Sequence, residues 1–359
     1  AKNYTFFAHG TDKDGDNLHP TKAGLKAMGE FCYDAAFYDI YAPEKDYHLT
    51  EIYLSDKGTL FGKGTKDSPI NNIHYANGLA AYGKEVTFYI DGTFTFPANT
   101  NIYLTENPSK LNIVGTSGSA KLVVGGNTLK CGTNTTFDSI TLENNYTTGT
   151  YIVGCYNDIT ITDSVKTTSV TGQPWHFVGG YTVYTVSEPV TTATFDTEKS
   201  VSSDKDCTVI VNGGSFTRFV LGNIRTQAAA PIGKYTGEMI AHIGDGATIS
   251  KTENYVGIVG HNYNQGKIVA NTSSHSLKEY ATFSTVSSPI VKDDTKNTGS
   301  VKLAKTYDAN YSGKVDLGDV LLAVKYHFDG VPRLESPVYD MAAELTLIDI
   351  INILISLTK

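Results

Sequence analysis

Near the C-terminus, oxygen-bearing residues recur at a spacing that suits a hard cation. Gly313 stands at position 6 of a twelve-residue segment, where a metal loop must turn sharply, and Lys314 follows at position 7 with its backbone carbonyl. Positions 1, 3, 5, 9 and 12 are Asp308, Asn310, Ser312, Asp316 and Asp319. Calcium takes six to eight oxygen ligands from one tight wrap of this kind. The spacing therefore predicts that this loop binds one calcium ion.

The loop is similar to the calcium loop of EF-hands, but its last ligand is an aspartate and no helix is expected before it. In these respects residues 304–359 resemble a dockerin, the small α-helical module that attaches bacterial enzymes to cohesin domains in cellulosomes. A dockerin carries two loop–helix repeats, and the first exiting helix is expected at Val320–Tyr326. The resemblance implies a secreted, extracellular protein of the cell-surface cellulosome, with the cohesin module of a scaffoldin as its partner. A chance Asp/Asn-rich turn is the alternative interpretation.

The second repeat of this region is degenerate. With Asp349 aligned as its last ligand, its first position is Val338 and its turn glycine is replaced by Ala343. Only the first loop is therefore expected to bind calcium, while a second helix is expected at Ile350–Leu357. The dockerin resemblance implies that cohesin contacts loop positions 10 and 11, which are Leu317, Gly318, Leu347 and Ile348. The apolar character of all but the glycine suits the centre of a protein interface.

A second pattern with catalytic residue types lies near the N-terminus, where Asp16 and His19 precede a helix expected from Thr21 to Tyr41. The block resembles the last conserved block of SGNH/GDSL hydrolases, in which the histidine is the general base and the aspartate orients it. The resemblance implies catalytic roles for both residues only if the missing part of the domain is supplied, because no Gly-Asp-Ser nucleophile turn occurs. We interpret residues 1–45 as the α/β remnant of a carbohydrate esterase domain within a longer polypeptide. A solvated loop before a helix is the alternative.

Between residues 50 and 300, short alternating apolar runs recur between Gly and Asn turns. Self-similarity at a period of roughly 20–30 residues is typical of solenoids, in which each coil buries its apolar face against the next. We predict a right-handed parallel β-helix with a capping helix within 70–81, and the stretch 53–90 resembles the entry coil of pectate-lyase-like proteins. An antiparallel β-sandwich is the alternative. The expected strands are Val86–Ile90, Leu111–Val114, Lys121–Val124, Ile140–Leu142, Ile159–Ile161, Thr208–Val211 and Ile240–Ile243.

The sequence says less about the function of this β-region than about that of the C-terminal loop. The resemblance implies clustered aspartates with a basic residue if the region is a polysaccharide lyase or glycoside hydrolase, but its aspartates are scattered. Aromatic residues are plentiful, and Trp175 and Tyr181 are the candidates for stacking on a glycan. The segment 172–180, with the irregular stretch to about Lys205, is expected to interrupt the repeat and to carry a functional loop. A structural spacer without glycan binding is the third hypothesis.

Composition narrows the classes of function further. The net charge is −8 and the chain has three arginines, which argues against a nucleic-acid partner. The 23 tyrosines and the charged fraction of 18% are typical of an extracellular β-rich protein. The apolar run Leu345–Leu357 contains Asp349 and Asn352, so we expect no membrane insertion. Cys131 and Cys155 lie about one repeat apart, which leaves a disulfide and two buried thiols as alternatives.

The sequence thus predicts a mainly β chain in three parts: residues 1–45, the β-helix of residues 50–300 and the dockerin of residues 304–359. The predicted function is that of a secreted cellulosomal subunit, anchored to a cohesin scaffold and engaging plant polysaccharide through its β-helix. Whether the chain is itself an enzyme is left open, because its esterase triad is incomplete.

Overall fold

The computed structural model describes residues 48–98, 102–183, 202–225, 234–249, 263–264, 266–272, 300–304, 315–329 and 347–358. The chain divides into two compact units, Ala1–His48 and Leu49–Lys359. Asp16, His19 and the helix expected after them lie outside the described residues.

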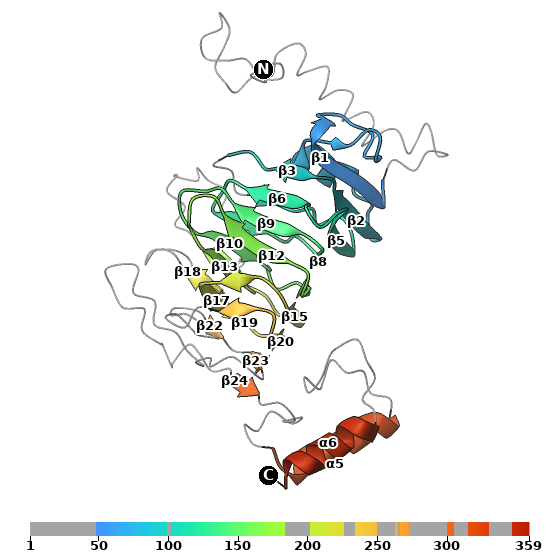
Figure 1. Cartoon of the computed structure of the whole chain (residues 1–359). Coiled ribbons are helices and arrows are strands. Elements are labelled where there is room, and N and C mark those ends of the chain that lie inside the picture. The colour runs from blue at the N-terminus through green and yellow to red at the C-terminus, as the bar shows by residue number, and fades with distance from the viewer. Residues whose placement is uncertain are drawn as a thin grey trace, which may run out of the picture. The chain divides into compact units, whose positions relative to one another are not determined.

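Parallel β-sheets account for most of the described chain, and Figure 1 shows their strands stacked in sequence order from β1 toward β24. The nine-stranded sheet contains, in spatial order, β1 (Glu51–Thr59), β2 (Glu85–Ile90), β5 (Lys110–Gly115), β8 (Asn134–Asp138), β11 (Ile159–Ile161), β15 (Cys207–Val211), β20 (Glu238–Ile243), β23 (Lys267–Thr272) and β24 (Ser300–Ala304). The five-stranded sheet contains β4 (Ile102–Tyr103), β7 (Thr128–Lys130), β10 (Thr150–Val153), β13 (Trp175–Val178) and β17 (Arg218–Val220). The four-stranded sheet contains β3 (Thr93–Thr95), β6 (Lys121–Val124), β9 (Thr141–Asn144) and β12 (Lys166–Ser169).

Three short parallel pairs complete the described strands. They are β14 (Thr182–Val183) with β18 (Ile224–Arg225), β16 (Ser215–Phe216) with β21 (Thr248–Ile249), and β19 (Lys234–Tyr235) with β22 (Tyr263–Asn264). In the second of these pairs, Phe216 lies opposite Ile249.

The chain visits the three large sheets in rotation, so that β2, β3 and β4 are followed by β5, β6 and β7 in the same three sheets. Glu85 lies opposite Lys110, and Lys110 in turn lies opposite Asn134, so that successive coils advance the chain by nearly the same interval. The predicted repeat is therefore confirmed for these turns of the chain. The ladders of all three large sheets are parallel, which is compatible with a β-helix and does not fit the antiparallel sandwich.

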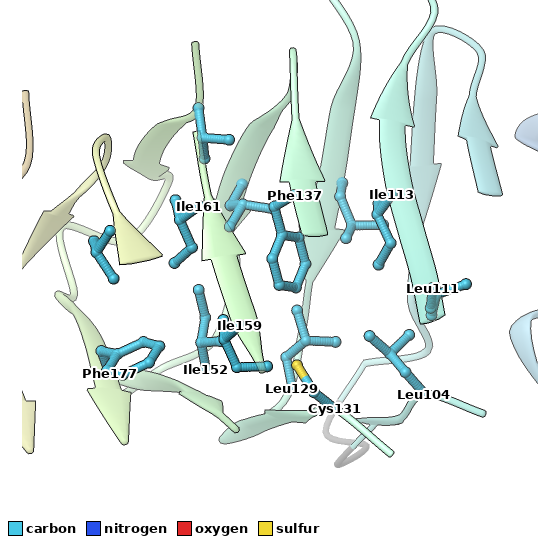
Figure 2. Packing of buried hydrophobic residues seen from close by; sticks show 14 of the residues in the cluster. Leu104, Leu111, Ile113, Leu129, Cys131, Phe137, Ile152, Ile159, Ile161 and Phe177 are labelled. Carbon is cyan, nitrogen blue, oxygen red and sulfur yellow. The ribbon is translucent and has the colours of Figure 1, made fainter. Parts of the chain in front are cut away.

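Strand alternation builds a continuous apolar core inside these coils. Every second side chain points inward, as with Val86, Phe88 and Ile90 of β2, which are at most 1% exposed. Figure 2 shows the inward side chains of successive strands meeting between the sheets. Phe177 and Phe219 stack with ring centroids 4.8 Å apart. Each fully buried side chain of this size contributes about 1.5–3 kcal/mol to folding.

The expected interruption of the repeat between residue 172 and about residue 205 is confirmed in part. Ile159 lies opposite Thr135, 24 positions earlier, and opposite Val209, 50 positions later, so this coil is about twice as long as the one before it. The strand β13 at the start of the segment is nevertheless regular. β13 pairs in register with β10 on one side and β17 on the other. Its sequence alternates with the strand period, and Trp175 and Phe177 enter the core. Gly172 supplies a turn with φ of 74° before the strand.

The predicted capping helix is present as α3 (Ile73–Leu79). The Asn72 side chain caps it by accepting a hydrogen bond from the Tyr75 N–H at 2.9 Å. Ile73 and Ala76 are buried in the same core as β1, with which the helix is in contact.

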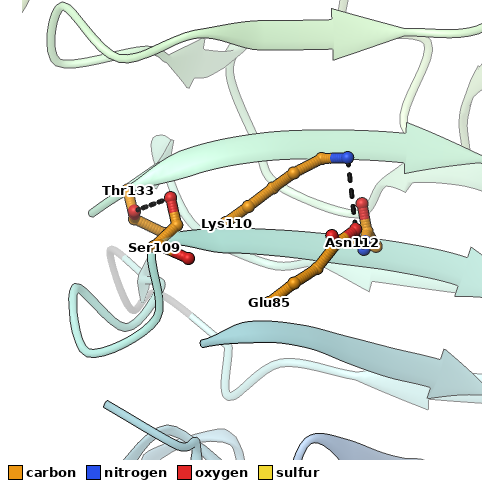
Figure 3. A network of polar contacts seen from close by, with 5 residues as sticks. All are labelled: Glu85, Ser109, Lys110, Asn112 and Thr133. Atoms are coloured by element: carbon orange, nitrogen blue, oxygen red, sulfur yellow. Dashed lines mark hydrogen bonds and ion pairs between the residues drawn. The ribbon is translucent and has the colours of Figure 1, made fainter. Parts of the chain in front are cut away.

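Polar side chains on the outer face of the nine-stranded sheet join one coil to the next. In Figure 3, Glu85 of β2 meets Lys110 and Asn112 of β5. The Asn112 amide donates to Glu85 Oε1 at 2.7 Å, and this bond, with Lys110, holds the pKa of the glutamate below its usual value. Both ionic partners are about half exposed, so this ion pair contributes little to stability.

The described cysteines Cys131, Cys155 and Cys207 are buried free thiols, so the first two do not form the disulfide considered above. Burial raises the pKa of Cys155 and of Cys207 to about 12. Both side chains therefore stay protonated and act as small apolar groups.

Two further helices are α5 (Leu317–Asp329) and α6 (Leu347–Ser356). Each begins three residues before the expected helix, and α5 ends three residues after its expected end while α6 ends one residue before it. They pack on one another through a small cluster of their own, consisting of Val320, Ala323, Ile350 and Ile353. No described helix has the length and apolar character needed to cross a membrane.

Candidate functional site

The first turn of α5 is built by two aspartates that accept hydrogen bonds from the backbone of this turn. Asp316 Oδ1 accepts from the Gly318 N–H at 2.7 Å, and Asp319 Oδ2 accepts from the Asp316 N–H at 2.7 Å. This arrangement resembles a capping box, which satisfies N–H groups that a helix leaves unpaired at its start. The two carboxylates are thereby held at the point where the predicted loop enters the helix.

Asp319 is fully buried, with 0% of its surface exposed. A buried carboxylate is costly unless cations or hydrogen bonds surround it, and calcium is a cation that oxygen ligands of this kind bind. Asp316, at position 9 of the loop, is exposed and accepts the Gly318 N–H through its Oδ1 atom. The donor chemistry at positions 9 and 12 therefore fits calcium.

The other four predicted ligands, Asp308, Asn310, Ser312 and Lys314, lie outside the described residues. Within the part of the chain that the structure describes, no group of three or more His, Cys, Asp or Glu side chains could hold a metal ion. The complete calcium site thus remains a prediction, of which Asp316 and Asp319 are the described portion.

Exposed apolar side chains are concentrated on α5, α6 and the residue that follows α6. Of 13 large hydrophobic side chains that are exposed in the described chain, nine belong to this short segment. We call them the apolar helix set: Leu317, Leu321, Phe328, Leu347, Ile348, Ile351, Leu354, Ile355 and Leu357. Apolar surface that is gathered in this way is typical of a protein interaction site.

Three of the four residues predicted to contact cohesin belong to this set. Leu317 is 61% exposed, Leu347 is 59% and Ile348 is 67%, while Gly318 is partly exposed between Leu317 and the buried Asp319. The sequence reasoning missed the rest of the set on α6, namely Ile351, Leu354 and Ile355. The sequence does contain a signal for these residues. Apolar side chains occur on more than one face of α6, whereas Ile350 and Ile353 alone fill the contact with α5.

The two glycan-binding candidates do not lie on an open surface. Trp175 is 3% exposed, and its indole N–H donates to the Thr168 carbonyl at 2.9 Å. The prediction for Trp175 does not fit this placement, since the side chain belongs to the core. Tyr181 is partly buried and contacts Tyr156 edge-on, and burial raises the pKa of its hydroxyl to about 12.

The scattered aspartates of the β-region support the coils. Asp158 Oδ1 accepts from the Thr208 N–H on the next coil, and Asp206 Oδ1 accepts from the Glu238 N–H in the same way. Asp138 accepts from the hydroxyls of Thr162 and Ser164, each at 2.8 Å. These carboxylates are bound to neighbouring coils rather than gathered in one cluster.

Comparisons with models of known protein families, with curated proteins and with solved structures gave no match for this chain.

Proposed function

We propose that this chain is a secreted subunit of a cellulosome-like assembly, anchored by its C-terminal helix pair to a cohesin-type partner in a calcium-dependent way. In this proposal residues 304–359 are the dockerin and residues 50–300 are a right-handed parallel β-helix that engages plant polysaccharide. Residues 1–45 are the end of a larger carbohydrate esterase domain, a role that rests on the sequence block around Asp16 and His19.

The observation that carries the proposal is the junction of loop and helix at the start of α5. There the fully buried Asp319 adjoins the exposed Leu317, two positions away along the chain. A metal held by Asp319 would fix the first turn of α5, and with it the position of Leu317. Binding of the ion and binding of the partner are therefore expected to be coupled.

The calcium ligands in this proposal are the side chains of Asp308, Asn310, Ser312, Asp316 and Asp319 with the backbone carbonyl of Lys314. The ion supplies a positive charge that compensates the buried carboxylate and holds the loop to the helix. A ligand set that includes Asp319 also explains why a charged residue is tolerated at 0% exposure beside the apolar cluster of Val320 and Ala323.

The partner surface in this proposal is the apolar helix set. Leu347 and Ile348 on α6 are its foremost candidates, because both are more than half exposed at the N-terminal turn of that helix. Apolar side chains that are exposed alone and buried in a complex gain about 25 cal/mol for each Å² removed from water. Leu317 and Leu321 on α5 would add to the same contact.

The test is calorimetric titration of calcium into the metal-stripped full chain, followed by binding to a panel of cohesins with and without EDTA. We expect one calcium ion per chain and cohesin binding only in its presence. Asp308→Ala and Asp319→Asn should each weaken both. Asp206→Asn is the matched control, because Asp206 caps a strand of the β-region.

An absence of both calcium binding and cohesin binding would overturn the proposed function. Calcium binding without any cohesin binding would retain the metal site and reject the anchoring role.

A further inference from the structure

Two tyrosines stand side by side on the outer face of the nine-stranded sheet. Tyr53 of β1 lies directly opposite Tyr89 of β2. The neighbours of Tyr89 along the strand, Phe88 and Ile90, are in the core, so alternation places the tyrosines on the outer face. Their rings stack with centroids 4.8 Å apart and planes inclined by 26°. Both side chains are partly exposed, so the pair presents aromatic surface to solvent.

One face of the Tyr89 ring remains for a ligand. Tyr53 covers the face on the side of β1, while the residue opposite Tyr89 on the other side is the shorter Val114 of β5. The Tyr89 hydroxyl donates to Glu51 Oε1 of β1 at 3.4 Å, which inclines the ring toward β1. Val114 is partly exposed, so the space beside the free face of the ring is open to solvent.

A row of short polar side chains runs beside this ring and crosses the coils. Thr87 of β2 lies opposite Asn112 of β5, which lies opposite Thr136 of β8. All three are partly exposed, and neighbouring members are separated by one strand spacing, about 4.8 Å. Within the described part of the chain, no hydrogen bond engages the hydroxyl of Thr87 or of Thr136. These hydroxyls are therefore available to a ligand as donors and acceptors.

Glu85, on the same face of β2, adds a carboxylate at the edge of this row. Figure 3 shows it pointing toward Lys110 and Asn112 of the next coil. Its bonds to Asn112 and Lys110 hold the pKa of Glu85 below the usual value, so the carboxylate is ionised at neutral pH. Glu85 is exposed and can accept hydrogen bonds from a ligand as well.

The charge of this face discriminates between classes of polysaccharide. The three outward rows that cross β1, β2, β5 and β8 hold three carboxylates and one ammonium group, namely Glu51, Glu85, Asp138 and Lys110. The ammonium group is already paired with Glu85 at 3.2 Å. A uronate polymer would be repelled here, whereas the hydroxyls of a neutral sugar can donate to the carboxylates.

We propose that the outer face of β1, β2, β5 and β8 binds a neutral, linear polysaccharide that crosses the coils along Thr87, Asn112 and Thr136. One sugar packs its apolar face on the free face of Tyr89, and its hydroxyls bond Glu85 and the Asn112 carbonyl. The next sugar along the row bonds the Thr136 hydroxyl. The inference rests on the proposed engagement of polysaccharide by the β-region, for which it names the face and the class of glycan, and it is independent of the anchoring.

The test is calorimetric titration of the full chain with three probes: cellohexaose, xylohexaose and hexagalacturonate. We expect a neutral probe to bind and the uronate probe to fail. Tyr89→Leu should weaken binding of the neutral probe at least about tenfold, because the aromatic contact with the sugar is lost. Thr136→Val should weaken it at least about threefold, because the variant keeps the shape of the side chain but loses the hydroxyl.

Tyr103→Leu is the matched control. Tyr103 is 46% exposed on β4 of the five-stranded sheet, and its hydroxyl also donates to a glutamate, Glu106, at 3.3 Å. This variant should bind the neutral probe as the parent chain does. Fluorescence of Trp175, the single tryptophan of the chain, verifies that each variant keeps its core.

The inference is overturned if no neutral probe binds, if the uronate probe binds as tightly as the neutral ones, or if Tyr103→Leu weakens binding as much as Tyr89→Leu. Neutral-probe binding that folded Tyr89→Leu and Thr136→Val leave unchanged rejects this face while retaining polysaccharide engagement elsewhere. Calcium and cohesin titrations on the same samples separate these outcomes from a failure of the anchoring role.

Discussion

The β-region and the α5–α6 pair differ in how much of their apolar surface is buried. In the β-region, strand after strand turns apolar residues inward, and the core is continuous from Ile52 to Ala270. In the helix pair, four residues form the core while nine large apolar side chains remain exposed. The coils therefore bury their apolar side chains within the chain itself. The helix pair leaves most of its large apolar side chains exposed, as is typical of a protein interaction surface.

The same contrast holds for buried polar groups. In the coils, carboxylates such as Asp158 cap the next strand and stay exposed, so their charge is solvated. At the start of α5, Asp319 is fully buried. Within the β-region, His176 is also buried, and its Nδ1 atom has no hydrogen-bond partner among the described contacts.

The largest expected change in the free energy of unfolding comes from a substitution in the core of the β-region. Phe137→Ala should lower the free energy of unfolding by about 3–5 kcal/mol, because Phe137 is fully buried and the variant leaves a cavity. Phe328→Ala on α5 is the matched control, since Phe328 is 74% exposed and its removal should change stability by less than about 0.5 kcal/mol. Denaturant unfolding followed by Trp175 fluorescence measures both. Equal destabilisation by the two changes would contradict the distinction between the regions.

The second effect is a pH dependence that His176 confers on the β-region. Its pKa of about 3 in the folded chain is below the ordinary value of 6.5, so the unfolded chain binds the proton first. Stability from this group is complete above pH 6.5 and is lost as the pH falls toward 3. At about pH 4 the loss relative to neutral pH is about 3 kcal/mol. The ring of Tyr151 and the guanidinium of Arg218 are the groups that lie beside the imidazole on the neighbouring strands.

The measurement is the free energy of unfolding between about pH 4 and pH 7 for the parent chain and for His176→Phe. The parent should lose stability more steeply as the pH falls, and His74→Phe should follow the parent, because His74 is exposed on α3. Parallel curves for all three would show that His176 is not kept neutral by burial.

The third effect concerns the exposed face of the helix pair. Ile348→Ser should weaken binding of a cohesin at least about 30-fold, as expected for an interface hot spot, with little change in stability. Val170→Ser is the control, because Val170 is 65% exposed on the β-region outside the apolar helix set. Surface plasmon resonance at saturating calcium gives both affinities. If Ile348→Ser unfolds the helix pair, as circular dichroism would reveal, Leu347→Ser provides the second probe of the same turn.

The strands of the coils could be predicted from the sequence because their pattern repeats. Runs such as Lys121–Val124 and Ile159–Ile161 are strands with those bounds, since alternation of apolar residues and regular turn signals are both local. It misjudged Trp175–Val178 because a Gly- and Pro-containing approach resembles a loop, whereas pairing with β10 and β17 decides the structure. It could not predict that Tyr151, His176 and Arg218 are neighbours, because these residues are distant in the sequence and come together only through the register of the coils. For the helix pair it found the helices, but a partner's contacts are not encoded in a local period.

The smallest effect tests whether the carboxylates of the coils are structural caps. Asp158→Ala should lower the free energy of unfolding by about 1 kcal/mol, because the Thr208 N–H loses its acceptor at 2.7 Å. Asp158→Asn keeps an oxygen in that place and should restore most of the loss. Asp163→Ala removes the same charge from an exposed side chain for which the structure gives no hydrogen bond, and it should change stability very little. If Asp158→Asn is as unstable as Asp158→Ala, the charge rather than the hydrogen bond stabilises the coil, and carboxylates in both regions would then need the same electrostatic explanation.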